Sequence, residues 1–121
     1  MHGAGHSAQS FALMASLMKD QHTVCAFDWR GHGDHVREDE TMMSTETLIA
    51  DALEVLEYLR QKYPDRSIIV IGHSMGGALA TKVVSHIQNQ MPDSDLKKAV
   101  LGTIIIDVVE GSAMEALPFM E

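Results

Sequence analysis

The sequence predicts an α/β fold in which parallel strands are flanked by helices. Apolar segments of strand length alternate with amphipathic helical segments along the whole chain. The run Ser67-Ile68-Ile69-Val70-Ile71 also has the continuous β-branched pattern of a strand buried on both faces of a parallel sheet. The expected order is helix, strand, helix, strand, helix, strand, helix, which is typical of right-handed crossovers. A length of 121 residues suits a single domain.

The first helix and strand are predicted from apolar spacing. Residues 7–19 carry apolar side chains three and four positions apart, which indicates an amphipathic helix with Ser7 as its N-cap. The apolar run 23–28 indicates a buried strand that ends at Asp28. Cys25, the only cysteine, is expected to be a small buried apolar residue within that strand.

The middle of the chain predicts an exposed loop over residues 34–44 and a long helix over residues 45–62, ended by Pro64. One face of this helix is apolar. The other is expected to be a solvated surface of charged residues, namely Asp51, Glu54, Glu57 and Arg60.

The C-terminal half predicts two more helices and one more strand. A helix is expected from Met75 to about Gln90, and a third buried strand over residues 101–109. The sequence Ser112-Ala113-Met114-Glu115 has the pattern of a capping box and predicts a last helix, which Pro118 interrupts.

Composition excludes several classes of partner. The net charge is −8, and the 9 basic residues form no cluster, so neither nucleic acid nor an anionic membrane is expected as a partner. No apolar stretch approaches the roughly 20 residues of a membrane-spanning helix, and no signal peptide is recognisable. A single cysteine allows no intrachain disulfide, which favours a reducing compartment, the cytoplasm, with the nucleus as a second location.

The sequence Gly72-His73-Ser74-Met75-Gly76 lies between a predicted strand and a predicted helix, the context of a nucleophile elbow. In such a turn Ser74 is the nucleophile, and the N–H of Met75 can bind a developing oxyanion. A glycine-rich turn with an incidental serine is the alternative. His73 is not expected to act as the base, because adjacent residues at this turn point in different directions. A packing or hydrogen-bonding role suits it better.

Two further segments could complete a site around Ser74. The sequence His2-Gly3-Ala4-Gly5 resembles the loop that supplies a second oxyanion donor, from Ala4 or Gly5. Asp107 follows an apolar strand, and its position suits the acid that orients a catalytic histidine. Glu110 competes for that role, and Asp107 could instead cap a loop or helix.

At these residues the sequence resembles the protein phosphatase methylesterases, a family of the α/β-hydrolase superfamily. The resemblance is carried by residues 2–7, 72–78 and, most specifically, 106–117. It implies a serine carboxylesterase that removes the methyl ester from the C-terminal leucine of the type 2A protein phosphatase catalytic subunit. It also implies that Ser74 is the nucleophile and Asp107 the triad acid, and that no metal or organic cofactor is needed.

Two parts of such an enzyme are not found in this sequence. The triad order is serine, acid, histidine, and no histidine follows Asp107. The superfamily also places a strand before the His-Gly loop, between the segments 23–28 and 67–71, where only Met1 stands, so a gap is expected there. Residues 1–121 are therefore expected to be the central portion of an α/β-hydrolase domain and an inefficient esterase by themselves.

Two other functions stay open at this point. A generic carboxylesterase or lipase-like hydrolase would share the elbow, but it gives no reason for the segment that follows Asp107. A non-catalytic module could instead bind a phosphatase through the same surface without turning over an ester.

Overall fold

The chain folds around one pair of parallel strands. In the computed structural model, which describes residues 1–34 and 43–108, β1 (Ile68–His73) pairs in parallel with β2 (Val100–Ile106). The predicted α/β architecture is therefore confirmed, with the second strand ending three residues earlier than expected. The helix predicted from Ser112 onward lies outside the described residues.

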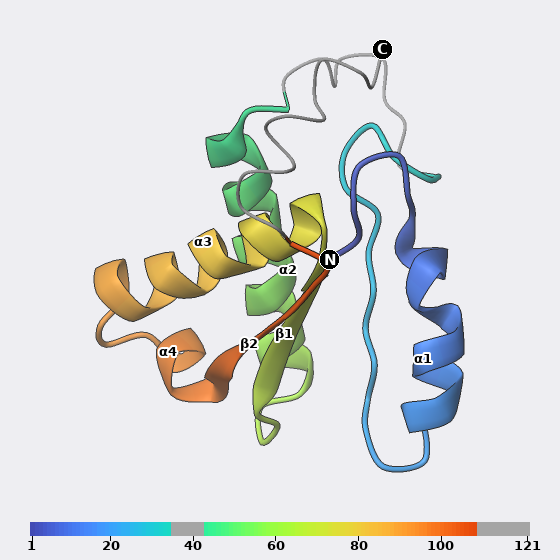
Figure 1. Cartoon of the computed structure of the whole chain (residues 1–121). Helices are drawn as coiled ribbons and strands as arrows, with labels where there is room; N and C mark the ends of the chain where they lie inside the picture. Colours follow the sequence, from blue (N-terminus) through green and yellow to red (C-terminus); the bar gives the residue numbers. More distant parts are fainter. Residues whose placement is uncertain (35–42, 109–121) are drawn as a thin grey trace.

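Two long helices confirm the predicted pattern and cover one side of the strands. They are α2 (Thr45–Lys62) and α3 (Met75–Gln90), and α3 contacts both strands (Figure 1). The apolar core lies between the two helices and β1, and Val83 and Ile87 of α3 are fully buried within it.

Serine side chains begin two of the helices on this side. The Ser44 hydroxyl accepts a hydrogen bond from the Thr47 N–H at 3.2 Å, which satisfies a free donor in the first turn of α2. The short α4 (Asp95–Ala99) was not predicted, although Ser94 caps it in the same way, accepting from the Lys97 N–H.

The predicted helix over residues 7–19 consists of a 3₁₀ turn, η1 (Ala8–Phe11), followed by α1 (Ala12–Met18) on the other side of the strands (Figure 1). Ser7 occupies the expected N-cap position, but its hydroxyl makes no capping hydrogen bond. Only Phe11 of these residues is buried, whereas the exposed fractions of Leu13 and Leu17 are 75% and 77%. The expected amphipathic face is therefore only partly covered.

The strand predicted over residues 23–28 is absent from the structure, and Cys25 is exposed rather than buried. The physical reason is the gap expected beside β1. A cavity of about 390 Å³ separates this segment from β1 and is lined by apolar side chains that include Phe27, Ile69 and Ile71. Without a neighbouring backbone at hydrogen-bonding distance, the segment is extended but forms no ladder.

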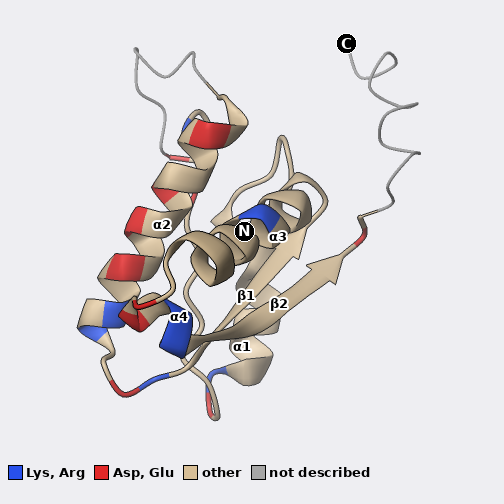
Figure 2. Cartoon of the chain, turned by 90° about the vertical axis from the view of Figure 1, so that its left-hand side faces the viewer, with Lys and Arg blue, Asp and Glu red and all other residues tan. Residues whose placement is uncertain are grey.

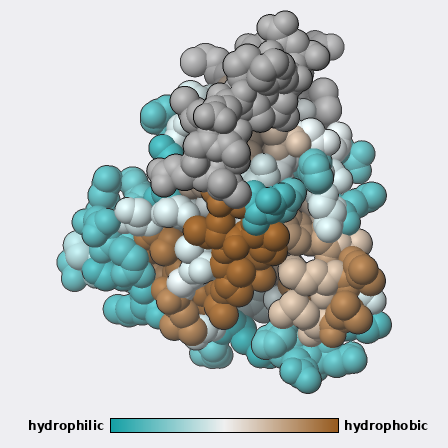
Figure 3. All heavy atoms as spheres, in the orientation of Figure 1, coloured by the Kyte–Doolittle hydropathy of each residue, from teal (hydrophilic) through white to brown (hydrophobic). Residues whose placement is uncertain are grey.

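The strands are also less buried than their sequences predict. Val70 is buried in β1, but Ile69 on the other face is 56% exposed, and Leu101 in β2 is 67% exposed. Figure 3 shows a continuous apolar area over this part of the molecule. One face of the sheet packs on α3 while the other meets little protein, so the expectation of burial on both faces is wrong for the described residues.

The sequence predicts a solvated charged face on α2, but in the structure this face is only partly solvated. Acidic residues follow the helix in Figure 2, but Asp51 forms a bidentate ion pair with Arg30, with both N···O distances at 2.6 Å. Each side chain is only 26% exposed. This pair joins the loop that follows residues 23–28 to α2. Among the described residues, no helix is long and apolar enough to cross a membrane.

Met1 bridges part of the gap. Its amino group donates to the Ile71 carbonyl at 2.7 Å, and its carbonyl accepts from the His73 N–H at 3.0 Å. These two bonds have the pattern of a parallel ladder. Burial lowers the pKa of the amino group from 8.0 to about 6.

We predict that acetylating Met1 stabilises the fold, and more strongly at pH 6 than at pH 8. The free amine of the unfolded chain protonates below pH 8, but the buried amine resists protonation, so stability falls between pH 8 and 6. An acetyl amide keeps the N–H bond to Ile71 and removes the charge. Allowing for partial solvent exposure, we expect a gain on the order of 1–2 kcal/mol at pH 6. Urea unfolding of both forms at pH 6, 7 and 8 measures it. An equal gain at all three values would contradict the assignment.

Candidate active site

Ser74 lies in the turn between β1 and α3, in a backbone conformation that few residues adopt. Its φ is 51° and its ψ is −123°, and it is one of two described non-glycine residues with positive φ. Such strain persists only where neighbouring contacts enforce it. Here the Ser74 N–H donates to the Ile106 carbonyl at 3.0 Å, and the Ser74 carbonyl accepts from Gly77 and Ala78 at the start of α3. The side chain is exposed at the carboxyl end of β1.

Two glycines allow three backbones to meet behind this turn. A Cβ atom on Gly72 would lie 2.2 Å from the Gly76 carbonyl oxygen, so β1 and α3 approach too closely for a side chain. A Cβ on Gly76 would lie 2.3 Å from the Met1 carbonyl oxygen and 2.5 Å from that of His2. The N-terminal segment is therefore held against the first turn of α3 by direct backbone contact.

This contact brings the His-Gly loop to Ser74. A Cβ on Gly3 would lie 3.1 Å from the Ser74 Cβ. The loop turns at once, since the His6 N–H donates to the Gly3 carbonyl at 3.2 Å and Gly5 has a φ of 69°. A positive φ at this third position, with none at Ala4, identifies a type II turn, which favours glycine there.

Two backbone N–H groups are left free at the site. Met75 is the first residue of α3, where helix geometry offers no intrahelical acceptor. Neither its N–H nor that of Ala4 donates a hydrogen bond within the described ranges 1–34 and 43–108. Both groups belong to segments that flank Ser74. Free backbone donors of this kind are what an oxyanion site uses, and the N-terminus of α3 adds a partial positive charge.

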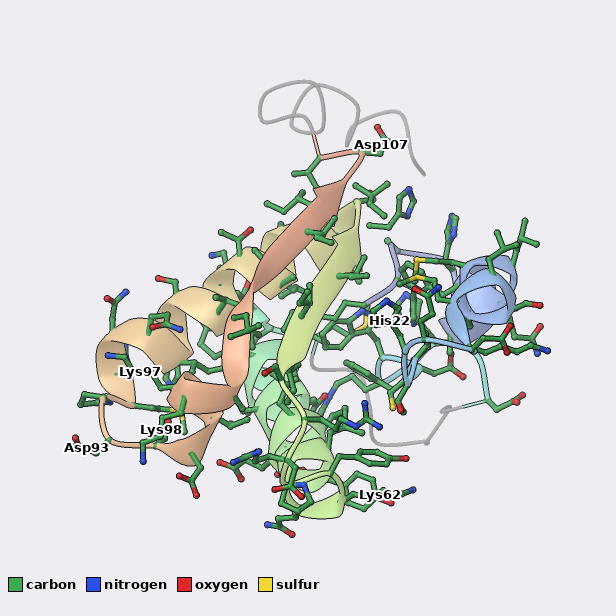
Figure 4. All side chains as sticks on the ribbon, turned by 90° about the horizontal axis from the view of Figure 1, so that it is seen from below. His22, Lys62, Asp93, Lys97, Lys98 and Asp107 are labelled. Carbon is green, nitrogen blue, oxygen red and sulfur yellow. The ribbon has the colours of Figure 1, made fainter. Side chains whose placement is uncertain are left out.

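Asp107 follows β2 directly and lies at the same end of the sheet as Ser74 (Figure 4). The hydrogen bond from Ser74 to Ile106 places the two segments side by side. The Asp107 side chain is 77% exposed, and its Oδ2 lies 3.8 Å from His73 Nε2. Its φ of 52° is the second positive value among non-glycine residues of the described chain. The competing carboxylate, Glu110, lies outside the described residues.

The His73 ring has a polar and an aromatic neighbour among the described residues. Besides Asp107, its ring faces that of His6 at a centroid distance of 5.4 Å. This agrees with a packing or hydrogen-bonding role and does not assign it another one. Within residues 1–34 and 43–108, no three His, Cys, Asp or Glu side chains are grouped so that they could hold a metal ion.

The sequence did not predict the contact between His2 and Trp29, which holds the His-Gly loop in place. His2 is 1% exposed, and its Nε2 accepts a hydrogen bond from the Trp29 backbone N–H at 3.1 Å. The Trp29 indole N–H donates in return to the His2 carbonyl at 3.1 Å. The one available signal was that Trp29, the only tryptophan of the chain, directly follows Asp28 at the end of an apolar run.

Comparison with known proteins shows the family of the chain. Residues 1–110 match the family model described as serine aminopeptidase, S33. The chain belongs to the α/β-hydrolase superfamily. Proteins named protein phosphatase methylesterase 1 are similar to it over its whole length, with 39% identity for the Schizosaccharomyces pombe protein and 40% for that of Bos taurus. The human protein is 39% identical.

These relatives are much longer than the chain. The match covers 99% of the chain and 34% of the Schizosaccharomyces pombe protein, and 100% of the chain and 30% of the bovine and human proteins. The chain thus spans about a third of the length of the curated relatives. It belongs to a hydrolase and esterase family.

We predict that Gly76→Ala destabilises this hydrolase domain and that Gly102→Ala does not. The new Cβ at position 76 would press on two backbone carbonyl oxygens that cannot rotate away, which costs about 1–3 kcal/mol. A Cβ at Gly102 in β2 would have no atom within 4 Å, so that variant is the matched control. Urea midpoints of the two variants decide the matter. Equal midpoints would show that the N-terminal segment is not held against α3.

Proposed function

We propose that the chain carries the nucleophile and the acid of a serine carboxylesterase of the protein phosphatase methylesterase type. The observation that supports this best is the strained, exposed Ser74, whose two flanking segments each carry a free backbone N–H group. The proposed substrate is the methyl ester on the C-terminal leucine of the type 2A protein phosphatase catalytic subunit. The resemblance of residues 106–117 supports this substrate, and the names of the relatives support a methyl ester on a protein phosphatase. We place the reaction in the cytoplasm and nucleus.

In the proposed reaction the Ser74 hydroxyl attacks the ester carbonyl carbon, and a base takes its proton. The carbonyl oxygen becomes an oxyanion, which the N–H groups of Met75 and Ala4 bind. Methanol leaves when the tetrahedral intermediate collapses to an acyl-enzyme, and a water molecule then hydrolyses this ester and restores Ser74. Asp107 would orient the histidine that serves as base. No metal or organic cofactor takes part in these steps.

No histidine follows Asp107 in the sequence, so the base has to be supplied when residues 1–121 are tested. We predict that this chain alone demethylates a peptide ending in leucine methyl ester no faster than Ser74→Ala does. Added imidazole should raise the rate of the unmodified chain and leave that of Ser74→Ala at the background. The rise should be a fraction of the 10²–10⁴-fold that a positioned base contributes, about tenfold at most. Methanol release measures it.

Ser85→Ala is the matched control, because Ser85 is an exposed serine of α3 away from the strand ends. It should keep the full imidazole response. An equal response in Ser74→Ala would remove Ser74 as the nucleophile. Faster unaided turnover that Ser74→Ala abolishes would show that the chain already contains a base.

The same assay separates the alternative functions. A generic carboxylesterase or lipase-like enzyme would prefer short acyl esters to the methylated phosphatase tail. A non-catalytic module would capture the phosphatase in a pull-down, while a fluorophosphonate would fail to label Ser74 with or without imidazole. The methylesterase proposal requires both labelling and preference for the tail.

A further inference from the structure

The Gly3 carbonyl accepts two hydrogen bonds, and this sets the direction of a neighbouring donor. His2 Nδ1 lies 2.8 Å from the carbonyl oxygen, and the His6 N–H donates to it at 3.2 Å. A trans peptide is planar, so its C=O and N–H point in opposite directions. Holding the Gly3 carbonyl therefore fixes where the Ala4 N–H points, although that N–H makes no hydrogen bond within the described ranges.

The His2 ring is itself held by Trp29. Its Nε2 accepts from the Trp29 backbone N–H, and the Trp29 indole donates to the His2 carbonyl, both at 3.1 Å. Both side chains are fully enclosed, with exposed fractions of 1% and 0%. A lone pair on Nε2 and a hydrogen on Nδ1 satisfy the whole arrangement, which is one tautomer of the neutral imidazole.

We propose that His2 and Trp29 are positioning residues that aim the Ala4 N–H at the oxyanion, and that they do so only while His2 is neutral. A proton on Nε2 would face the Trp29 N–H, and the bond that anchors the ring would be lost. The role of Ala4 as an oxyanion donor rests on the proposed function. The mechanical link from Trp29 through His2 to Ala4 rests on the hydrogen bonds alone.

The groups that face His2 favour its neutral form on balance. Burial is the largest influence and lowers the pKa of His2. The hydrogen bond to the Gly3 carbonyl is the next largest and raises this pKa, whereas His32 and the Met1 amino group lower it. The His32 ring lies 5.2 Å from that of His2. Asp28 acts in the opposite direction, with Oδ1 4.0 Å from His2 Nε2. Its two oxygens accept from the backbone N–H groups of Ala8 and Asp34, which hold the carboxylate in place beside the ring.

The experiment uses the single tryptophan as its probe. Trp29 fluorescence of the N-acetylated chain is recorded from pH 8 to pH 4.5, with far-UV circular dichroism as a check that the fold persists. Acetylation removes the Met1 amine, which would titrate in the same range. We expect one transition below pH 6.5, the ordinary pKa of histidine, and an Ala4 amide chemical shift in ¹⁵N NMR that moves with the same midpoint.

Two variants assign the transition. His2→Gln keeps a neutral acceptor for Trp29 and cannot titrate, so both signals should lose their pH dependence. His32→Gln is the matched control, since it leaves the His2 bonds in place. Its transition should remain and move to higher pH, because one influence that lowers the pKa of His2 is removed.

Three outcomes would overturn the proposal. They are the absence of a transition in the N-acetylated chain without substitutions, a transition that persists in His2→Gln, and a Trp29 transition that leaves the Ala4 amide unmoved. None of these measurements uses an ester. A failure of the esterase assay with a normal titration would therefore reject the proposed function and leave the mechanical link standing.

Discussion

The close approach of three backbones at Gly72 and Gly76 is the constraint on which the rest of the structure depends. Because neither residue has a side chain, the end of β1, the start of α3 and the segment after Met1 can touch. Ser74, with its positive φ, lies in the turn between these segments, and Gly3 lies against it. Strain at one residue is thus maintained by the packing of segments more than seventy residues apart, as is common at functional sites.

The conformation of the N-terminal loop depends on contacts with neighbouring segments. Met1 forms a single rung with β1, Trp29 anchors the His2 ring, and Asp28 binds the backbone of Ala8. The Arg30–Asp51 pair then ties the loop after Trp29 to α2. The orientation of the Ala4 N–H therefore depends on these contacts. Such support is what a preorganised oxyanion site needs, since donors that must reorient stabilise little charge.

Much of the candidate site was predictable from the residues alone. Glycines at positions 72 and 76 around Ser74, between a β-branched run and a helix, predict a strained turn for local steric reasons. The position of Asp107 was predictable from topology, because the carboxyl ends of parallel strands lie at one edge of the sheet. The His2–Trp29 contact was not, since nothing in the spacing of two residues 27 positions apart says that an indole meets a carbonyl.

By itself, the sequence determined the class of fold, the two long helices, the position of the turn around Ser74 and the superfamily. These depend on periodicity, capping and steric rules that act within a few residues. Only the tertiary structure decided what is buried. Cys25, Ile69 and Leu101 lie in apolar runs that predict burial, but all three are exposed. The run around Cys25 also does not form a strand. The physical reason is that burial and strand pairing need a partner surface, and beside β1 there is a cavity where a neighbouring backbone would have to lie.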